Sequence, residues 1–135
     1  MSTLSVATIK SLTTAAPVFQ NSSGTEKGQL AKFWVTFQGN SGGTNKTIDD
    51  DFNVSTVVDN GTGDFTINFT NSFSNDDYCV LGGHVSFSNG RNGFRVRPDG
   101  GITTNQTTSS VRIQCTQDGG MTDSLRIYVA GFGDS

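Results

Sequence analysis

The chain contains a single histidine, His84, so any nucleophilic catalytic centre would have to be built around it. Cys79 lies five positions earlier, and alternation along a strand places these two side chains on opposite faces. The sequence shows no nucleophile elbow, the sharp strand-to-helix turn that presents a catalytic serine. We therefore expect a protein without enzymatic activity and keep His84 only as a candidate binding residue.

Two groups of neighbouring carboxylates are the next candidates for chemistry. Residues 49–51 are three aspartates that could supply oxygen ligands to Ca²⁺, and Asp76 and Asp77 form a second group. Neither group has the ligand spacing of a calcium loop. Glycoside hydrolysis needs paired carboxylates on facing strands, and the chain has one glutamate. We expect solvated loop acids, with Asp77 or Asp59 capping a turn, and neither a metal nor a cofactor.

Three arginines, Arg91, Arg95 and Arg97, could bind an anion. On a strand, Arg95 and Arg97 share one face, opposite Phe94 and Val96. Two guanidinium groups on a solvated strand can hold a phosphate or an acidic sugar. They can equally keep a sheet face soluble or form ion pairs. The candidate partners for such pairs are Asp76, Asp77 and Asp99.

Trp34, the only tryptophan, lies in a segment that alternates as a strand over residues 29–39. One face of this strand carries Phe33, Val35 and Phe37, and the other carries Lys32, Trp34 and Thr36. Trp34 is therefore either a contact for a ligand or partner, or a partly exposed residue that closes the edge of the core.

The most regular pattern is a predicted β-hairpin over residues 52–69, whose turn contains Asn60 and Gly61. Its second arm places Phe65, Ile67 and Phe69 on one buried face. In its first arm the inward positions by the same alternation are Phe52, Val54, Thr56 and Val58.

Further strands are predicted at residues 78–88, where Gly82 and Gly83 indicate a bulge or a close backbone approach, and at residues 94–97. A last pair of strands is expected at residues 110–117 and 124–132, around the turn at 118–120. Its inward residues are Val111, Ile113 and Cys115, facing Leu125, Ile127 and Val129. No segment has helical periodicity. The pattern predicts an all-β fold, a small antiparallel β-sandwich (jelly-roll-like) or barrel of about eight or nine strands.

Cys79 and Cys115 are too few and too far apart for a usual zinc site. A disulfide would form if their strands were neighbours. We favour two buried reduced thiols that pack as small apolar residues.

The first 28 residues read as an extended arm, and residues 29–135 as the β-domain. Residues 2–10 alternate as a strand, and residues 12–28 form a polar, extended connector. We expect the arm to dock on a neighbouring subunit or a larger assembly, against the alternative of a frayed terminus. Its apolar contact residues are Leu4, Val6, Ile9, Val18 and Phe19.

The composition and net charge of the chain restrict the classes of partner that we expect. The net charge is −3 and the pI about 4.8, which argues against nucleic acid as a general partner. No run of 18 apolar residues is present, so no membrane insertion is expected. The N-terminus lacks the apolar segment of a secretory signal, so we expect a protein made and used without secretion. A hydrophobic content of 33% indicates a thin core, which favours stabilisation by neighbouring subunits.

Several of these segments together resemble short tail-fibre-like structural proteins of marine bacteriophages, including cyanophages and pelagiphages. The resemblance rests on AKFWVTF at residues 31–37, on FNVSTVVDNGTGDFTINFT at residues 52–70, and on Asp77 followed by Tyr78. It covers about residues 1–80 and is most specific in the predicted hairpin.

The resemblance implies a virion component that is made in the bacterial cytoplasm and forms a homotrimer. Its partners would be other phage virion proteins. The arm would anchor it, and the β-sandwich would be a knob that binds a host-surface glycan or protein. Its candidate receptor-binding residues are Trp34, His84, Arg91, Arg95 and Arg97. The length of the chain fits equally well a capsid decoration (head fibre or cement) protein with no receptor role.

Overall fold

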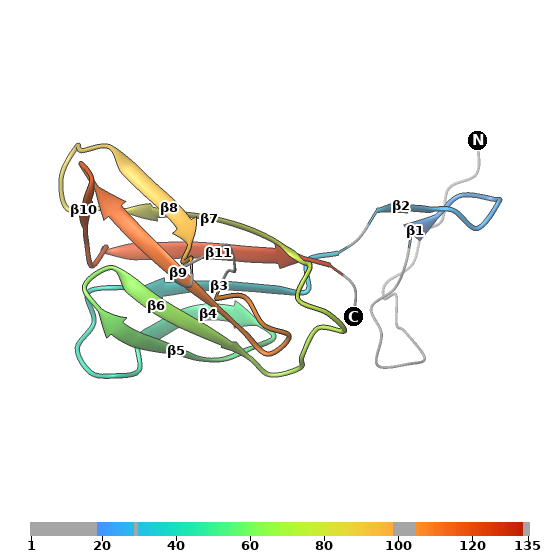
Figure 1. The fold of residues 1–135 in the computed structure, drawn as a ribbon, viewed down its shortest axis with the longest axis horizontal. Helices are drawn as coiled ribbons and strands as arrows, with labels where there is room; N and C mark the ends of the chain where they lie inside the picture. Colours follow the sequence, from blue (N-terminus) through green and yellow to red (C-terminus); the bar gives the residue numbers. More distant parts are fainter. Residues whose placement is uncertain (1–18, 29, 99–104, 134–135) are drawn as a thin grey trace.

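The computed structural model describes residues 19–28, 30–98 and 105–133. Within these ranges nine strands form two antiparallel sheets that make a β-sandwich, and two further strands form a hairpin at one end of it (Figure 1). The predicted all-β sandwich and its strand number are confirmed. The described residues contain no helix long and apolar enough to cross a membrane.

The four-stranded sheet has the order β4-β3-β11-β7. Its strands are β3 (Phe33–Gln38), β4 (Thr47–Phe52), β7 (Cys79–Val85) and β11 (Arg126–Phe132). The five-stranded sheet runs β10-β9-β6-β5, with β8 also paired to β9. Its strands are β5 (Val54–Gly61), β6 (Asp64–Phe69), β8 (Asn92–Val96), β9 (Ser110–Gln117) and β10 (Gly120–Met121).

The core lies between the two sheets and is built from the alternating faces that the sequence predicts. Phe33, Val35 and Phe37 of β3 face Phe65 and Ile67 of β6, and all five are buried. The rings of Phe37 and Phe65 meet edge to face, with centroids 5.3 Å apart. The inward residues of β9 complete the layer; they are Val111, Ile113 and Cys115.

The chain passes from one sheet to the other at Asn53, between β4 and β5. Asn53 has φ of 59°, a left-handed conformation that asparagine tolerates. Its side-chain nitrogen donates to the backbone oxygens of Lys32 and Asn71, at 3.0 Å each. The hairpin predicted over residues 52–69 is therefore too long, because Phe52 belongs to β4 in the other sheet and is exposed.

Three further inward assignments are wrong because of register and strand order. A register irregularity between Val54 and Thr56 puts Val57 in the core, where alternation predicts Thr56 and Val58. The strands β9 and β11 do not pair, since they lie in opposite sheets and β9 turns into β10. Leu125 precedes β11 and is exposed, whereas Ile127 and Val129 are buried as predicted.

The glycine pair of β7 reflects a close approach and not a bulge. β7 pairs with β11 in continuous register from Cys79 to Val85. A Cβ atom at Gly82 would overlap the ring of Phe94 in β8. Glycine at this position therefore lets the edges of the two sheets come together.

The cysteines are unpaired, so the disulfide alternative is wrong. Cys115 is buried as predicted, and burial together with the charge of Asp123 raises the pKa of its thiol to about 12. Cys79 is exposed at the start of β7, so the prediction of two buried thiols is wrong for this residue.

Residues 19–28 form a hairpin of β1 (Phe19–Gln20) and β2 (Glu26–Gly28), not the predicted extended connector. The side-chain oxygen of Asn21 accepts hydrogen bonds from the backbone of Ser23 and Thr25 and holds the turn. In Figure 1 this hairpin stands apart from the sandwich. Phe19 is exposed. The predicted strand at residues 2–10 lies outside the described residues, as do Leu4, Val6, Ile9 and Val18.

Candidate functional site

The outer face of the four-stranded sheet carries an apolar row that crosses all four strands. Strand register places Trp34 of β3 between Phe52 of β4 and Ala130 of β11, and Ala130 beside Leu81 of β7. Three of these side chains are large and exposed, with 53% of Phe52, 37% of Trp34 and 58% of Leu81 accessible. The outward position of Trp34 is confirmed.

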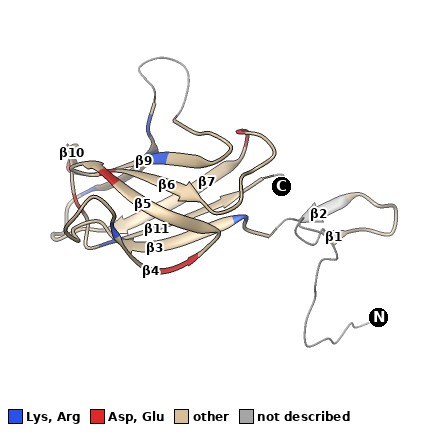
Figure 2. Ribbon diagram, turned by 90° about the horizontal axis from the view of Figure 1, so that it is seen from below, with Lys and Arg blue, Asp and Glu red and all other residues tan. Residues whose placement is uncertain are grey.

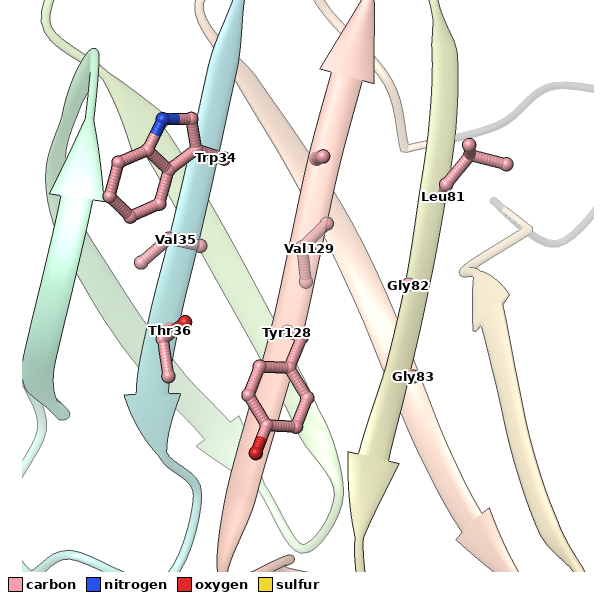
Figure 3. Close-up of a pocket in the computed structure, with 9 residues that line it drawn as sticks. Trp34, Val35, Thr36, Leu81, Gly82, Gly83, Tyr128 and Val129 are labelled. Carbon is pink, nitrogen blue, oxygen red and sulfur yellow. The ribbon is translucent and has the colours of Figure 1, made fainter. Parts of the chain in front are cut away.

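A second row of outward residues lies beside the first, and the two rows line a shallow groove of about 430 Å³. We call it the aromatic groove; it is lined by Trp34, Val35, Thr36, Leu81, Gly82, Gly83, Tyr128, Val129 and Ala130. Tyr128 of β11 lies between Thr36 of β3 and Gly83 of β7. Figure 3 shows Trp34 and Tyr128 on neighbouring strands, with bare backbone at Gly82 and Gly83. A Cβ atom at Gly83 would meet no atom within 4 Å, so the space above this residue is open.

Planar polar groups lie at one end of the same face. One carboxylate oxygen of Asp49 accepts from the amide of Gln38 at 2.7 Å, and the other accepts from Nε of Arg126 at 3.0 Å. The aspartates of residues 49–51 thus lie in the edge strand β4 and not in the predicted loop (Figure 2). Aromatic faces that stack on sugar C–H groups, together with carboxylate, amide and guanidinium groups that bind hydroxyls, suit a carbohydrate.

The predicted site residues fall in different places, and only Trp34 lies in the groove. Arg95 and Arg97 lie on the outer face of the opposite, five-stranded sheet, next to Arg112 and Asp64. Arg91 lies before β8, where its backbone N–H donates to the carboxylate of Asp118 at 2.9 Å.

His84 joins three parts of the sandwich. Its Nδ1 lies 2.7 Å from Oγ of Ser124, and its Nε2 lies 3.2 Å from the backbone oxygen of Gly93. Ser124 is fully buried, so this hydroxyl is out of reach of a substrate. With both ring nitrogens in these contacts, His84 connects β7 to β8 and to the segment just before β11.

Residues 39–43, Gly-Asn-Ser-Gly-Gly, also match the G-x-S-x-G pattern of serine hydrolases, but they do not form the strand-to-helix turn of a nucleophile elbow. They connect β3 to β4, and Oγ of Ser41 donates to the backbone oxygen of Gln38 at 2.9 Å. Within the described part of the chain, no three His, Cys, Asp or Glu side chains gather as metal ligands would.

Arg95, Arg97 and Arg112 form the arginine cluster, which surrounds Asp64. Arg112 donates to both oxygens of Asp64, at 2.6 and 3.2 Å, and Gln114 donates to one of them at 3.1 Å. Nε of Arg97 lies 3.3 Å from the same carboxylate. Burial alone raises the pKa of Asp64, but these hydrogen bonds and charges outweigh it and hold the pKa below its usual value.

A second ion pair joins a buried lysine, just before β4, to β5. Nζ of Lys46 lies 2.6 Å from the carboxylate of Asp59, and only 4% of the Lys46 side chain is accessible. The hydrogen bond from Lys46, and after it the one from the backbone of Gly61, lower the pKa of Asp59. The prediction that Asp59 caps a turn is confirmed, because its carboxylate accepts from Gly61 at 2.8 Å.

We expect the free energy of unfolding to fall as the pH drops below about 4, the usual aspartate value. Asp59 and Asp64 have lower pKa values in the folded protein than their ordinary 3.8. Their stabilisation is therefore complete above the unfolded pKa and is lost as the pH falls through the folded values. Urea unfolding at a series of pH values measures this slope.

Asp64→Asn is the matched control, since an amide of the same shape cannot titrate. At neutral pH the variant should be less stable than the wild-type protein, because Arg112 loses its charged partner. The difference in unfolding free energy should shrink as the pH falls. A difference that stays constant down to the acid limit would contradict the assignment.

Comparison with known proteins finds a likeness in fold alone. No protein family matches the chain, and no curated protein is similar to it in sequence. Among solved structures it is similar to the phiAB6 tailspike, solved in complex with three-repeated oligosaccharides of Acinetobacter baumannii surface polysaccharide. The TM-score is 0.50 with 12% identity over the whole of this chain, which spans 30% of the tailspike chain.

Proposed function

We propose that this protein is a structural component of a bacteriophage virion, a short fibre-like adhesin that binds a host-surface glycan through the aromatic groove. It acts as a binding module and not as an enzyme. The resemblance of residues 1–80 to tail-fibre-like proteins supports the virion role. The tailspike neighbour, solved with surface oligosaccharides, supports the choice of ligand class.

The observation that carries the glycan assignment is the aromatic groove itself. One sheet face exposes four large apolar side chains, those of Trp34, Tyr128, Phe52 and Leu81, and an exposed apolar patch of this kind is typical of a surface that binds a ligand or partner. The same face ends in the hydrogen-bonded Asp49, Gln38 and Arg126. A sugar chain laid across the strands meets apolar surface first and polar groups at its end.

We further propose a homotrimer anchored by residues 1–28, with residues 29–135 as the knob. The exposed ring of Phe19 in β1 is available for such a contact. Leu4, Val6, Ile9 and Val18 are the other apolar residues that we assign to the anchor. Light scattering measures the mass of the particle in solution. The full chain should be a trimer, and a chain that lacks residues 2–28 should be a monomer.

Trp34→Ala should weaken glycan binding by about tenfold or more, the usual effect of removing a central aromatic contact. Gly83→Val should weaken it similarly by filling the groove, since the added Cβ meets no protein atom. The measurement is binding to an array of bacterial lipopolysaccharide and capsule oligosaccharides, followed by calorimetric titration of the best ligand.

Phe87→Ala is the control for that experiment. Phe87 is 62% accessible, against 37% for Trp34, and does not line the groove, so its loss removes a more exposed ring at another place. Equal binding by wild type, Trp34→Ala and Gly83→Val would refute the groove as the glycan site.

The place of the protein in the particle is tested by immunogold electron microscopy of intact virions. Label at the tail supports the adhesin. Label over the head would instead make it a capsid decoration protein, and absence from purified particles would refute the virion assignment.

A further inference from the structure

The arginine cluster holds more positive charge than its acidic partner can neutralise. Register places Asp64 of β6 opposite Gln114 of β9, and Gln114 opposite Arg95 of β8. Arg112 and Arg97 follow one step along the same sheet face, where the backbone N–H of Arg97 donates to the oxygen of Arg112 at 2.8 Å. Three guanidinium groups thus gather around one carboxylate, in a chain whose net charge is −3.

The single carboxylate is already fully used. Its two oxygens accept from Arg112 and Gln114 and contact Nε of Arg97. Nε of Arg95 donates to the side-chain oxygen of Gln114 at 2.8 Å. These contacts fix the orientation of the guanidinium groups while using mainly their Nε atoms.

The terminal nitrogens of Arg95 and Arg97 therefore remain for a further acceptor. Within residues 19–28, 30–98 and 105–133, the side-chain hydrogen bond of Arg95 comes from its Nε atom, and Nε is also the atom of Arg97 nearest to Asp64. Arg95 is exposed, and 35% of the Arg97 side chain is accessible. Two oriented guanidinium groups that face solvent form a bidentate donor set for an oxyanion.

We propose that the arginine cluster binds the anionic groups of an acidic polysaccharide, as carboxylate or as sulfate or phosphate. The site lies on the opposite sheet from the aromatic groove and does not depend on it. An acidic polysaccharide carries spaced charges, which a protein with net charge −3 tolerates better than the dense phosphates of a nucleic acid. Arg95 and Arg97 contact the anion. Gln114 positions Arg95 directly, and Asp64, held by Arg112, positions Arg97.

The test measures calorimetric binding of three polymers to the full chain: dextran sulfate, polygalacturonate and unsubstituted dextran. We expect binding to one or both acidic polymers, weakened by added salt, and no binding to dextran. Preference for dextran sulfate identifies a tetrahedral oxyanion, and preference for polygalacturonate a carboxylate. No binding to either acidic polymer would overturn the proposal, and so would equally tight binding to double-stranded DNA.

Single substitutions locate the site. Arg95→Gln and Arg97→Gln should each weaken binding by about tenfold, the loss of one hydrogen bond to a charged group. Arg91→Gln removes the same charge outside the cluster and should change binding by less than about twofold. If Arg91→Gln weakens binding as much as the other two, binding is diffuse and the site is wrong.

Thermal melts check that all three variants are folded. If the wild-type chain binds no acidic polymer but still binds a glycan of the array through the aromatic groove, the arginine site is refuted and the proposed adhesin function is not.

Discussion

Replacing Phe65 with alanine is expected to lower the free energy of unfolding by about 3–5 kcal/mol. Phe65 is the second residue of β6 and is fully buried, and its ring packs edge to face on Phe37. Nζ of the buried Lys46 lies 5.8 Å from the centre of the same ring. Removing the ring of Phe65 leaves a cavity. The strands paired to both edges of β6 prevent this cavity from collapsing. A loss of this size unfolds a marginally stable domain.

Urea unfolding followed by circular dichroism measures the loss. Phe87→Ala is the control, because the ring of Phe87 is exposed and its removal should cost less than about 0.5 kcal/mol. If Phe65→Ala costs less than about 1 kcal/mol, the two faces of β6 have been assigned the wrong way round.

Gly63→Ala should destabilise the protein by about 2–5 kcal/mol, from a left-handed backbone and a steric overlap together. Gly63 has φ of 65° between β5 and β6. An added Cβ would lie 2.5 Å from the backbone oxygen of Cys115 and 2.6 Å from the backbone nitrogen of Thr122. Both are backbone atoms, and they are hydrogen-bonded to each other, with the N–H of Thr122 donating to the oxygen of Cys115 at 3.1 Å. Moving either atom away from the added Cβ strains this hydrogen bond.

Gly119→Ala separates the two contributions. Gly119 has φ of 85°, and a Cβ atom there would meet nothing within 4 Å. Its replacement should cost only the left-handed term of about 1–2 kcal/mol. Equal losses for the two variants, measured by the same urea titration, would mean that the overlap at Gly63 is relieved without cost.

Local patterns predicted the individual strands well. Alternation alone gives the buried faces of β3, β6 and β9, because each of these strands has neighbours on both edges and one face on the core. Alternation failed in β5, where a register irregularity exchanges Val57 for Val58. It also failed at Phe52, because a left-handed asparagine carries the chain into the other sheet one residue later.

The candidate sites depend on strand order, which local patterns do not contain. Tyr128 is outward by alternation against Ile127 and Val129, but its place on the same face as Trp34, opposite Thr36, follows only from the pairing of β3 with β11. Likewise Arg97 meets Asp64, a residue in a strand 33 positions earlier that was not among its predicted partners. Long-range pairing of this kind is set by the packing of the whole sandwich.

The position of β3 has a mechanical consequence. This strand is hydrogen-bonded on both edges, to β4 and β11, and Trp34 is its second residue. If the N-terminal arm is the anchor and Trp34 the contact with a surface, the tension between them passes through a few residues at the start of β3. A pull along this strand loads its hydrogen bonds to β4 and β11 together, in shear, because they lie across the direction of the force. Fluid flow that pulls on a bound particle would then not unfold the domain that binds the surface.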